Sequence, residues 1–222
     1  MQTSPLTSNV VFNIGSMEIT GAVVTTWGIM AVLVVLAALL TRRPADPARP
    51  PGLAELLVTS IAAQIQDVVR TDPQPLLPLL GTLFIYLVAA NLSGLLPGLR
   101  APTANLETPA ALALIVFFAV HVHGVRAQGL MGYLASFARP KLIMLPLNLL
   151  SEVTRTLSLT VRLFGNIMSG EFLIALVLAI AGLFVPIPQM ALELLVGVVQ
   201  AYIFTVLATV FIGAASGTPD QT

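Results

Sequence analysis

The sequence has no cysteine and very little charge. Since none of its 222 residues is Cys, disulfides, thiolate metal sites and cysteine nucleophiles are excluded. Charged residues make up 9% of the chain, whereas an ordinary soluble domain carries about 25%. With 57% hydrophobic residues, the chain has the composition of a membrane protein, and a soluble globular protein is excluded.

Charge of either sign is also never concentrated in one block. Ten Lys and Arg balance ten Asp and Glu, so the chain offers no broad basic surface for nucleic acid and no acidic tail. The single lysine, Lys141, follows Pro140, and the glycine-rich phosphate loop that ends in Lys-Ser or Lys-Thr is therefore missing. We expect no nucleotide to be bound or hydrolysed by this chain.

The first half of the chain predicts two membrane spans and a helix at the membrane surface. Residues 1–18 form a polar outer segment without the basic start of a secretory signal. Residues 19–41 are free of charge, and these 23 residues are enough to cross about 30 Å of hydrocarbon. Apolar residues at helical spacing opposite polar ones predict an interfacial amphipathic helix over 53–70, and a second charge-free run predicts a span over 74–97.

The second half predicts three further spans. The third covers 108–126, and the last covers 189–214, behind a turn that Pro186 and Pro188 are expected to force. Residues 215–222 form an inner tail.

A long helix is expected between the third and the last span, over 142–183. Its residues 147–180 contain no proline, and 34 residues at about 1.5 Å each reach about 51 Å. This helix must tilt strongly to fit the hydrocarbon, or break near Gly165 or Gly170. Gly165 and Ser169, four residues apart, would let a neighbouring helix approach closely.

Together these segments make residues 1–222 a single all-α polytopic membrane domain. It has five transmembrane helices, of which the last two form a tilted hairpin that carries an arginine, and one interfacial amphipathic helix. Arginine and lysine favour the cytoplasmic side, which predicts an outer N-terminus and a cytoplasmic C-terminus. The inner residues are Arg42, Arg43, Arg49, Arg70, Arg126, Arg139 and Lys141, against Arg100 in the outer loop.

Ionisable residues inside the membrane lie almost entirely in the last two helices. Each costs about 2.5 to 3.5 kcal/mol on insertion scales, so those that are retained are candidate functional groups. Arg162 stands far from either end of the long helix, and because arginine keeps its proton at any accessible pH it is a permanent cation. It can attract a carboxylate but cannot pass a proton onward. Spacings of three and four residues place it in one stripe with Asn148, Glu152, Arg155, Leu159 and Asn166.

A second polar group surrounds Glu171, nine residues beyond Arg162. Nine steps of about 100° put these two on opposite sides of the helix, so they are no simple pair. On the last helix Gln189, Glu193 and Gln200 form a polar stripe among apolar residues, and such a stripe has no place facing lipid. We expect it to face the long helix and to line a hydrated path with Glu171. The alternative is that Glu193 and Gln200 only form hydrogen bonds between helices.

Other polar residues have simpler interpretations. Glu152 and Arg155, three apart near the cytoplasmic end, fit a local ion pair as well as a pathway role. His121 and His123 lie near the inner end of the third span, where packing at the interface is favoured over a proton relay. Neither histidine has a partner at metal-ligand spacing, so no metal or cofactor is predicted.

Several segments resemble a known family. The run Ser-Leu-Thr-Val-Arg-Leu-Phe-Gly-Asn at 158–166, followed by Gly170 and Glu171, resembles the arginine helix of subunit a of F-type rotary ATP synthases. The run Gln-Ala-Tyr-Ile-Phe-Thr-Val-Leu at 200–207 resembles the last helix of that subunit. Further matches extend the resemblance over about residues 17–215, and they lie at 91–98, 103–106, 110–114 and 129–134.

The resemblance implies a stator subunit beside a rotating ring of c subunits, each with one membrane carboxylate. Arg162 would attract each passing carboxylate and block direct leakage between two offset half-channels. The ion, expected to be a proton and alternatively sodium, would enter through one half-channel and leave through the other. The implied path leads from the outer half-channel to the cytoplasmic exit through Glu171, Glu193, Gln200, Asn166, Ser158, Glu152 and Asn148.

The resemblance also implies the surroundings of the chain. These are the b subunits of a peripheral stalk, the whole ATP synthase complex, and the lipid bilayer of a bacterial inner membrane. The chain would not be an enzyme alone, because the nucleotide chemistry would lie on other subunits.

Two positions depart from the family pattern. Many relatives have Glu where Asn148 stands, and Glu152, one turn later, is expected to take its part. Arg155 stands where relatives vary between basic and neutral residues. A protein of another class, a secondary transporter in which Arg162 binds an anionic substrate, would usually show paired repeats, and no second copy of the arginine segment is found in the sequence.

Overall fold

Helices make up nearly all of the chain that the structure describes. The computed structural model describes residues 10–14, 17–41, 52–69, 74–94, 101–137, 143, 145–182 and 184–216. Its helices are α1 (Gly21–Thr41), α2 (Leu53–Val69), α3 (Leu77–Ser93), α4 (Glu107–Phe137), α5 (Leu145–Ala181) and α6 (Pro186–Ala215), and a short 3-10 helix, η1, spans Pro102–Ala104. Two short antiparallel strands, β1 (Val10–Ile14) and β2 (Met17–Thr20), precede α1.

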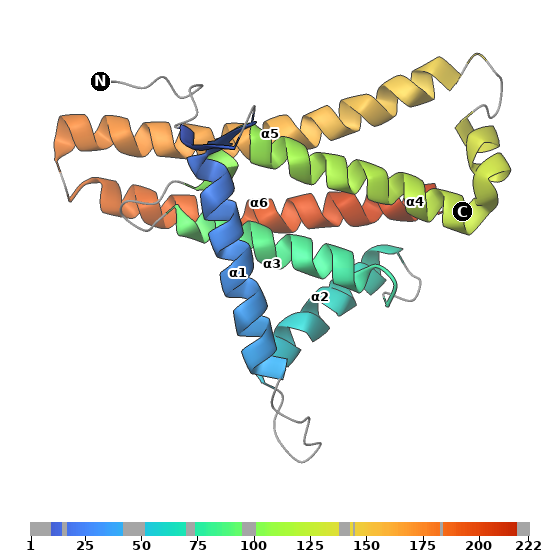
Figure 1. The fold of residues 1–222 in the computed structure, drawn as a ribbon, viewed down its shortest axis with the longest axis horizontal. Coiled ribbons are helices and arrows are strands. Elements are labelled where there is room, and N and C mark those ends of the chain that lie inside the picture. The colour runs from blue at the N-terminus through green and yellow to red at the C-terminus, as the bar shows by residue number, and fades with distance from the viewer. Residues whose placement is uncertain are drawn as a thin grey trace.

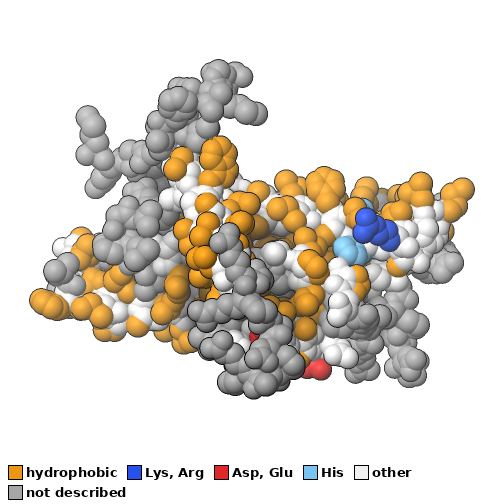
Figure 2. All heavy atoms as spheres, turned by 60° about the horizontal axis from the view of Figure 1, so that its bottom comes forward, with side chains coloured by type: hydrophobic (Ala, Val, Ile, Leu, Met, Phe, Trp, Pro, Cys, Tyr) orange, Lys and Arg blue, Asp and Glu red, His pale blue; other side chains and the backbone are white. Residues whose placement is uncertain are grey.

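Four of these helices, α1, α4, α5 and α6, are long and apolar enough to cross a membrane. With 17 residues, α3 is apolar but shorter. The prediction of an all-α polytopic membrane protein is confirmed. Figure 2 shows a largely apolar surface over the described residues, and on α1 Trp27 is 60% and Val34 is 67% exposed, which suits side chains that face lipid.

Some helix boundaries differ from those that the sequence predicts. Ile19 and Thr20 belong to β2, so α1 begins at Gly21. The start predicted for the last helix, residue 189, is wrong, because α6 begins at Pro186 and the predicted turn lies just before these prolines. A proline in the first turn of a helix lacks an N–H that would have no partner there anyway, so it starts a helix without breaking one.

A sharp elbow divides α4. The helix continues beyond its predicted end at residue 126 to Phe137, but Gly129 has φ 73° and ψ 159°, a backbone conformation that is open to glycine and strained for other residues. The chain turns at this glycine, and the segment after it folds back so that the ring of Tyr133 packs against Gly124. Figure 1 shows this short segment leading from α4 toward the start of α5.

The helix α6 holds the packed body together (Figure 1). It packs against α2, α3, α4 and α5, while α4 also packs along α5. In Figure 1, α1 crosses these helices steeply, and its contacts are with α3, η1 and β2. The body is therefore α2 to α6, and the packing of α4 and α6 along α5 fixes the position of α5. The shared core contains Leu80, Leu87, Val116, Leu163, Phe204 and Ile212.

The longest helix, α5, is continuous over 37 residues. The break that the sequence offers near Gly165 or Gly170 does not occur in it. Figure 1 shows instead a change of direction near its middle, and α5 and α6 pack as a hairpin.

The predicted orientation in the membrane rests mostly on residues that lie outside the described part of the chain. These are Arg42, Arg43, Arg49, Arg70, Arg100, Arg139 and Lys141.

Candidate functional site

Arg162 opens onto a groove along α5 and α6. The groove has a volume of about 440 Å³; α5 supplies most of its wall, and Leu207 and Phe211 come from α6. Arg155, Ser158 and Arg162 line it together, because residues three and four positions apart share one face of a helix. The permanent cation of Arg162 is exposed at this surface.

A second cavity, of about 210 Å³, lies deeper, between α4, α5 and α6. Glu152 and Asn148 line it from α5, and neither of them lines the groove. The predicted stripe on α5 covers about 80° of the helix surface. It therefore extends from the buried face of α5 to the face that borders the groove. Its edge at Glu152 and Leu159 is buried, whereas its edge at Arg155 and Arg162 faces the groove.

Glu152 and Arg155 form the local ion pair that is one interpretation of their spacing. Arg155 Nη1 lies 3.5 Å from Glu152 Oε2, and the guanidinium carbon lies 5.1 Å from the centroid of the Phe211 ring on α6. The side chain of Arg155 is 45% exposed and that of Glu152 only 11%. A partly exposed pair of this kind contributes about 0 to 1 kcal/mol, and an exposed cation–π contact about 0.5 to 1 kcal/mol. Arg155 is therefore held, but weakly.

Asn148 has a structural partner at the elbow. Its Nδ2 donates a hydrogen bond of 2.8 Å to the carbonyl oxygen of Phe137, the last residue of α4. The last carbonyl groups of a helix lack partners within that helix, so this bond caps the elbow and ties it to the start of α5.

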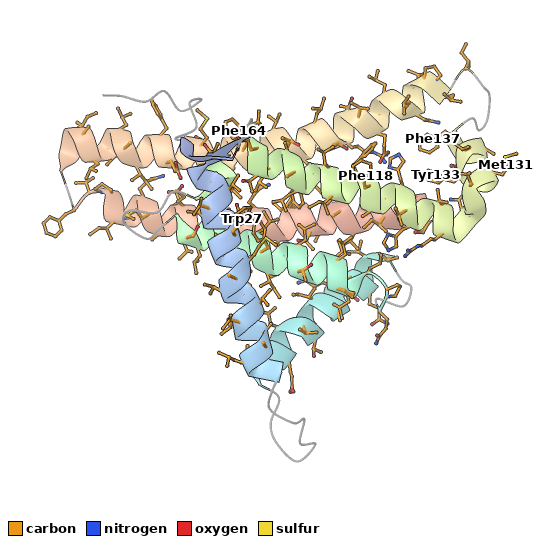
Figure 3. The ribbon with its side chains drawn as sticks, in the orientation of Figure 1. Trp27, Phe118, Met131, Tyr133, Phe137 and Phe164 are labelled. Atoms are coloured by element: carbon orange, nitrogen blue, oxygen red, sulfur yellow. The ribbon has the colours of Figure 1, made fainter. Side chains whose placement is uncertain are left out.

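His121 belongs to an aromatic cluster inside the elbow. Figure 3 shows Tyr133 and Phe137 turned toward the helices while Met131, 84% exposed, points away. The centroid of the His121 ring lies 4.2 Å from that of Phe117 and 5.8 Å from that of Tyr133. Its Nδ1 lies 2.8 Å from the carbonyl oxygen of Phe117, which can only accept, so the proton sits on Nδ1. This arrangement is packing of the kind that the sequence favours for His121.

At the far end of the hairpin, Glu193 of α6 faces α5 at Gly170. A β-carbon at position 170 would lie 2.5 Å from Glu193 Oε1, so glycine leaves the space that this carboxylate occupies. The next residue of α5, Glu171, brings a second carboxylate to this end of the hairpin. Gly165, where the sequence predicts a close approach, has no described atom within 4 Å of such a β-carbon. A close approach between α5 and α6 therefore occurs at Gly170, and the approach of a neighbouring helix beside Gly165 stays a prediction.

Gln200 is buried with its amide incompletely satisfied. It is 6% exposed, and its Nε2 has no hydrogen-bond partner among the described residues. Buried amide groups normally have a protein or water partner, so this atom has the environment of a group that binds water. Gln189, further along α6, and Asn166 on α5 are half-buried.

Asn91 is a connecting residue whose long-range contacts the sequence does not predict. Its Nδ2 donates to the Gly197 carbonyl oxygen at 2.8 Å, and its Oδ1 accepts from Thr103 Oγ1 at 3.0 Å. These bonds link α3, η1 and α6 one turn before Gln200. Only the matching motif at 91–98 marks the region in the sequence, and it says nothing of a contact with Gly197.

Two further residues of the site also escape sequence reasoning. Ser151 lines both the groove and the deeper cavity, and its spacing of four from Arg155 could have indicated it. Phe211 also lines both, but an apolar residue in an apolar helix gives no signal. Within the described residues, no three His, Cys, Asp or Glu side chains gather where they could hold a metal ion.

Comparison with known proteins agrees with the geometry. A model of the family described as ATP synthase A chain matches residues 23–213. The chain is similar to ATP synthase subunit a 2 of Bradyrhizobium sp. strain BTAi1, with 70% identity and 98% of each chain covered. It is also similar to ATP synthase subunit a of Albidiferax ferrireducens, with 47% identity over 91% of this chain and 89% of the relative. ATP synthase subunit a 1 of Hahella chejuensis is likewise 47% identical over 91% of this chain and 87% of the relative. Because the matches extend over nearly the whole of both partners, the chain belongs to the family of ATP synthase subunit a.

Proposed function

We propose that this chain carries protons across a bacterial inner membrane to and from a ring of c subunits, with Arg162 as the fixed cation that each ring carboxylate meets. As the ion-translocating membrane subunit of an ATP synthase it is not catalytic by itself. The observation that carries the proposal is a permanent cation, in a membrane helix, that opens onto a groove along the packed hairpin.

The exposed face of α5 supports contact with the ring. Only 11% of the most apolar stretch of α5 is buried within the chain, against 44% in α6. Val161 is 62% and Phe172 is 67% exposed, and the surface beside Gly165 is open within the described residues. A partner helix could therefore bring a carboxylate close to Arg162, where low water content strengthens the attraction between the two charges.

The positions of the other polar residues support two half-channels. Glu171, Glu193 and Gln200 surround the outer one, and the unsatisfied amide of Gln200 suits a hydrated path. Asn148 and Glu152 face the deeper cavity toward the other end of the hairpin, which would serve as the cytoplasmic exit. We place Asn166 and Ser158 between them, on either side of Arg162, because all three lie on α5 at helical spacing.

The same proposal includes the orientation of the chain in the membrane and its neighbours. The N-terminus lies outside and the C-terminus in the cytoplasm, and the exposed face of α1 is available to lipid or to the b subunits of the peripheral stalk.

The coupling ion can be tested by asking whether ATP hydrolysis by the purified complex requires sodium. Independence from sodium is expected, and a requirement would assign sodium to the same path.

The deciding variant is Arg162→Ala in the assembled complex. We expect ATP-driven proton pumping and ATP synthesis to be lost, with subunit a still present in the purified complex. Without the cation, nothing draws the proton from each ring carboxylate and nothing separates the half-channels.

Arg126→Ala is the matched control, because Arg126 is an exposed arginine of α4 that lines neither the groove nor the deeper cavity. This variant should pump normally. Normal coupling in Arg162→Ala would overturn the proposal.

A further inference from the structure

The groove beside Arg162 and the deeper cavity are neighbours that share part of their walls. Three residues line both spaces: Ser151 and Arg155 of α5 and Phe211 of α6. Ser158 and Arg162 line only the groove, whereas Asn148 and Glu152 line only the cavity. A direct passage between the two spaces would run past these shared side chains.

Among the three, Arg155 bridges the gap between the helices. Its guanidinium group has the Glu152 carboxylate on one side, at 3.5 Å, and the Phe211 ring on the other, with 5.1 Å to the ring centroid. Glu152 belongs to the cavity and Phe211 to α6, so the group stands where the two spaces meet and where α5 faces α6.

We propose that Arg155 is a movable partition between the two spaces, a positioning residue that holds Glu152 on the cavity side and keeps the groove closed to the cytoplasmic cavity until a carboxylate enters the groove. This inference rests on the proposed function, because it takes the groove as the place where ring carboxylates pass and the cavity as the cytoplasmic exit.

The contacts of Arg155 allow it to move. Its ion pair at 3.5 Å is longer than the roughly 2.7 to 2.9 Å of a strong charge-assisted hydrogen bond, and its side chain is 45% exposed. Glu152, 11% exposed, is the fixed member of the pair. Rotation of the arginine side chain alone is enough to release the carboxylate.

The charges give a reason for the movement. Arg155 and Arg162 are seven residues apart, two turns of α5, and both line the groove. A carboxylate that moves along this groove is attracted by both cations, so it competes with Glu152 for Arg155. When Arg155 turns toward it, Glu152 loses its partner and its carboxylate is released on the cavity side. Opening is thereby tied to the presence of a ring carboxylate.

The test uses thiol accessibility in the assembled complex. The chain has no cysteine, so an introduced thiol is the only one it contributes. Ser158→Cys places a thiol in the groove and Ser136→Cys places one in the cavity. A methanethiosulfonate reagent with a trimethylammonium group is added to inverted membrane vesicles, whose cytoplasmic face is outside, and the rate of labelling is measured.

With Arg155 present, we expect the Ser136→Cys thiol to react quickly and the Ser158→Cys thiol slowly. Adding Arg155→Ala should speed labelling at Ser158→Cys at least tenfold and leave Ser136→Cys unchanged. Arg155→Lys keeps a charge that can pair with Glu152 but not the planar group on Phe211, so labelling should rise less. Phe211→Leu, which removes the ring and keeps an apolar side chain, should act in the same direction as Arg155→Ala.

Rapid labelling of Ser158→Cys while Arg155 is present would overturn the proposed partition, and so would the lack of any acceleration with Arg155→Ala. Equal acceleration at both thiols would also overturn it, because it would mean a general loosening of the hairpin. These results are separate from the test of the proposed function. Arg162→Ala can abolish pumping while Arg155→Ala leaves the labelling pattern unchanged, in which case the partition alone fails.

Discussion

At one end of the α5–α6 hairpin, the inner half in the proposed orientation, the carboxylate of Glu152 lies 3.5 Å from a guanidinium nitrogen of Arg155. At the other end, the outer half in the proposed orientation, Glu193 packs against Gly170 beside the second carboxylate residue Glu171. The same two helices thus place opposite charges together at one end and like charges together at the other.

This difference in charge indicates different roles for the two ends of the hairpin. A pair of opposite charges is neutral, so it fixes side chains and leaves little field to attract an ion. Two like carboxylates relieve their repulsion by taking up a proton or a cation between them. The outer end is therefore suited to capturing ions, and the inner end to controlling their release.

The largest effect should come from removing both outer acids. Glu171→Gln combined with Glu193→Gln should lower ATP-driven proton uptake into inverted vesicles more than tenfold, because both carboxylates of this end of the hairpin are removed. Each single variant should lose less, since one acid remains. Uptake can be followed with a pH-sensitive dye. Glu55→Gln, at an exposed position of α2, is the matched control and should pump normally; normal uptake in the double variant would remove the acids from the path.

A smaller loss of pumping should follow from Gly170→Ala. The new β-carbon would lie 2.5 Å from Glu193 Oε1, so the carboxylate must move, and its flexible side chain can do so without unfolding the hairpin. We expect a several-fold loss of pumping with a normal amount of subunit a in the complex. Gly28→Ala, on α1 with open space around it, should change neither quantity. Equal pumping by both alanine variants would contradict the importance of this contact.

At the inner end the expected effect is on stability. Arg155→Ala should destabilise the chain by about 1 to 2 kcal/mol, because it leaves a largely buried carboxylate without its cation and removes the contact with Phe211. Glu152→Gln should cost less, and the double variant should recover part of the loss through a coupling of about 0.5 to 1 kcal/mol. The readout is the fraction of complex that keeps subunit a after heating. Strict additivity would show that the pair has no interaction energy.

The smallest effect is expected at His121. His121→Phe keeps an aromatic ring in the cluster with Phe117 and Tyr133 and loses one hydrogen bond to a backbone carbonyl. Pumping should change less than twofold, and stability by about 1 kcal/mol at most. A tenfold loss of pumping with normal assembly would instead make His121 a proton carrier of the inner half.

Sequence reasoning succeeds where a single helix decides the outcome. Charge-free runs predict the helices that are long enough to cross the membrane, although the run at 74–97 forms only the 17-residue α3. The lack of proline over 147–180 allows the unbroken α5, which is one of the two outcomes that the sequence leaves open. The isolated cation of Arg162 is evident because a charge in such a run is costly. Family membership follows from ordered motifs, which need no knowledge of packing.

It fails where several helices meet. The deeper cavity depends on how α4 folds back at Gly129, and a glycine in the sequence does not reveal its positive φ. Phe211 gains its contact with Arg155 only through the packing of α6 on α5. The close approach of Glu193 to Gly170 depends on the rotation of α6 about its own axis, which spacing within α5 cannot set.

The unbroken length of α5 has a consequence for direction. If straight, its 37 residues would reach about 55 Å, and since they must fit about 30 Å of hydrocarbon, the two ends would lie up to about 45 Å apart within the plane of the membrane. An ion that enters near one end and leaves near the other cannot simply cross the bilayer; it must also be carried sideways. Under the proposed function, a stationary chain with this shape needs a neighbour that moves along it, and that sideways displacement would be the motion that a rotor turns into torque.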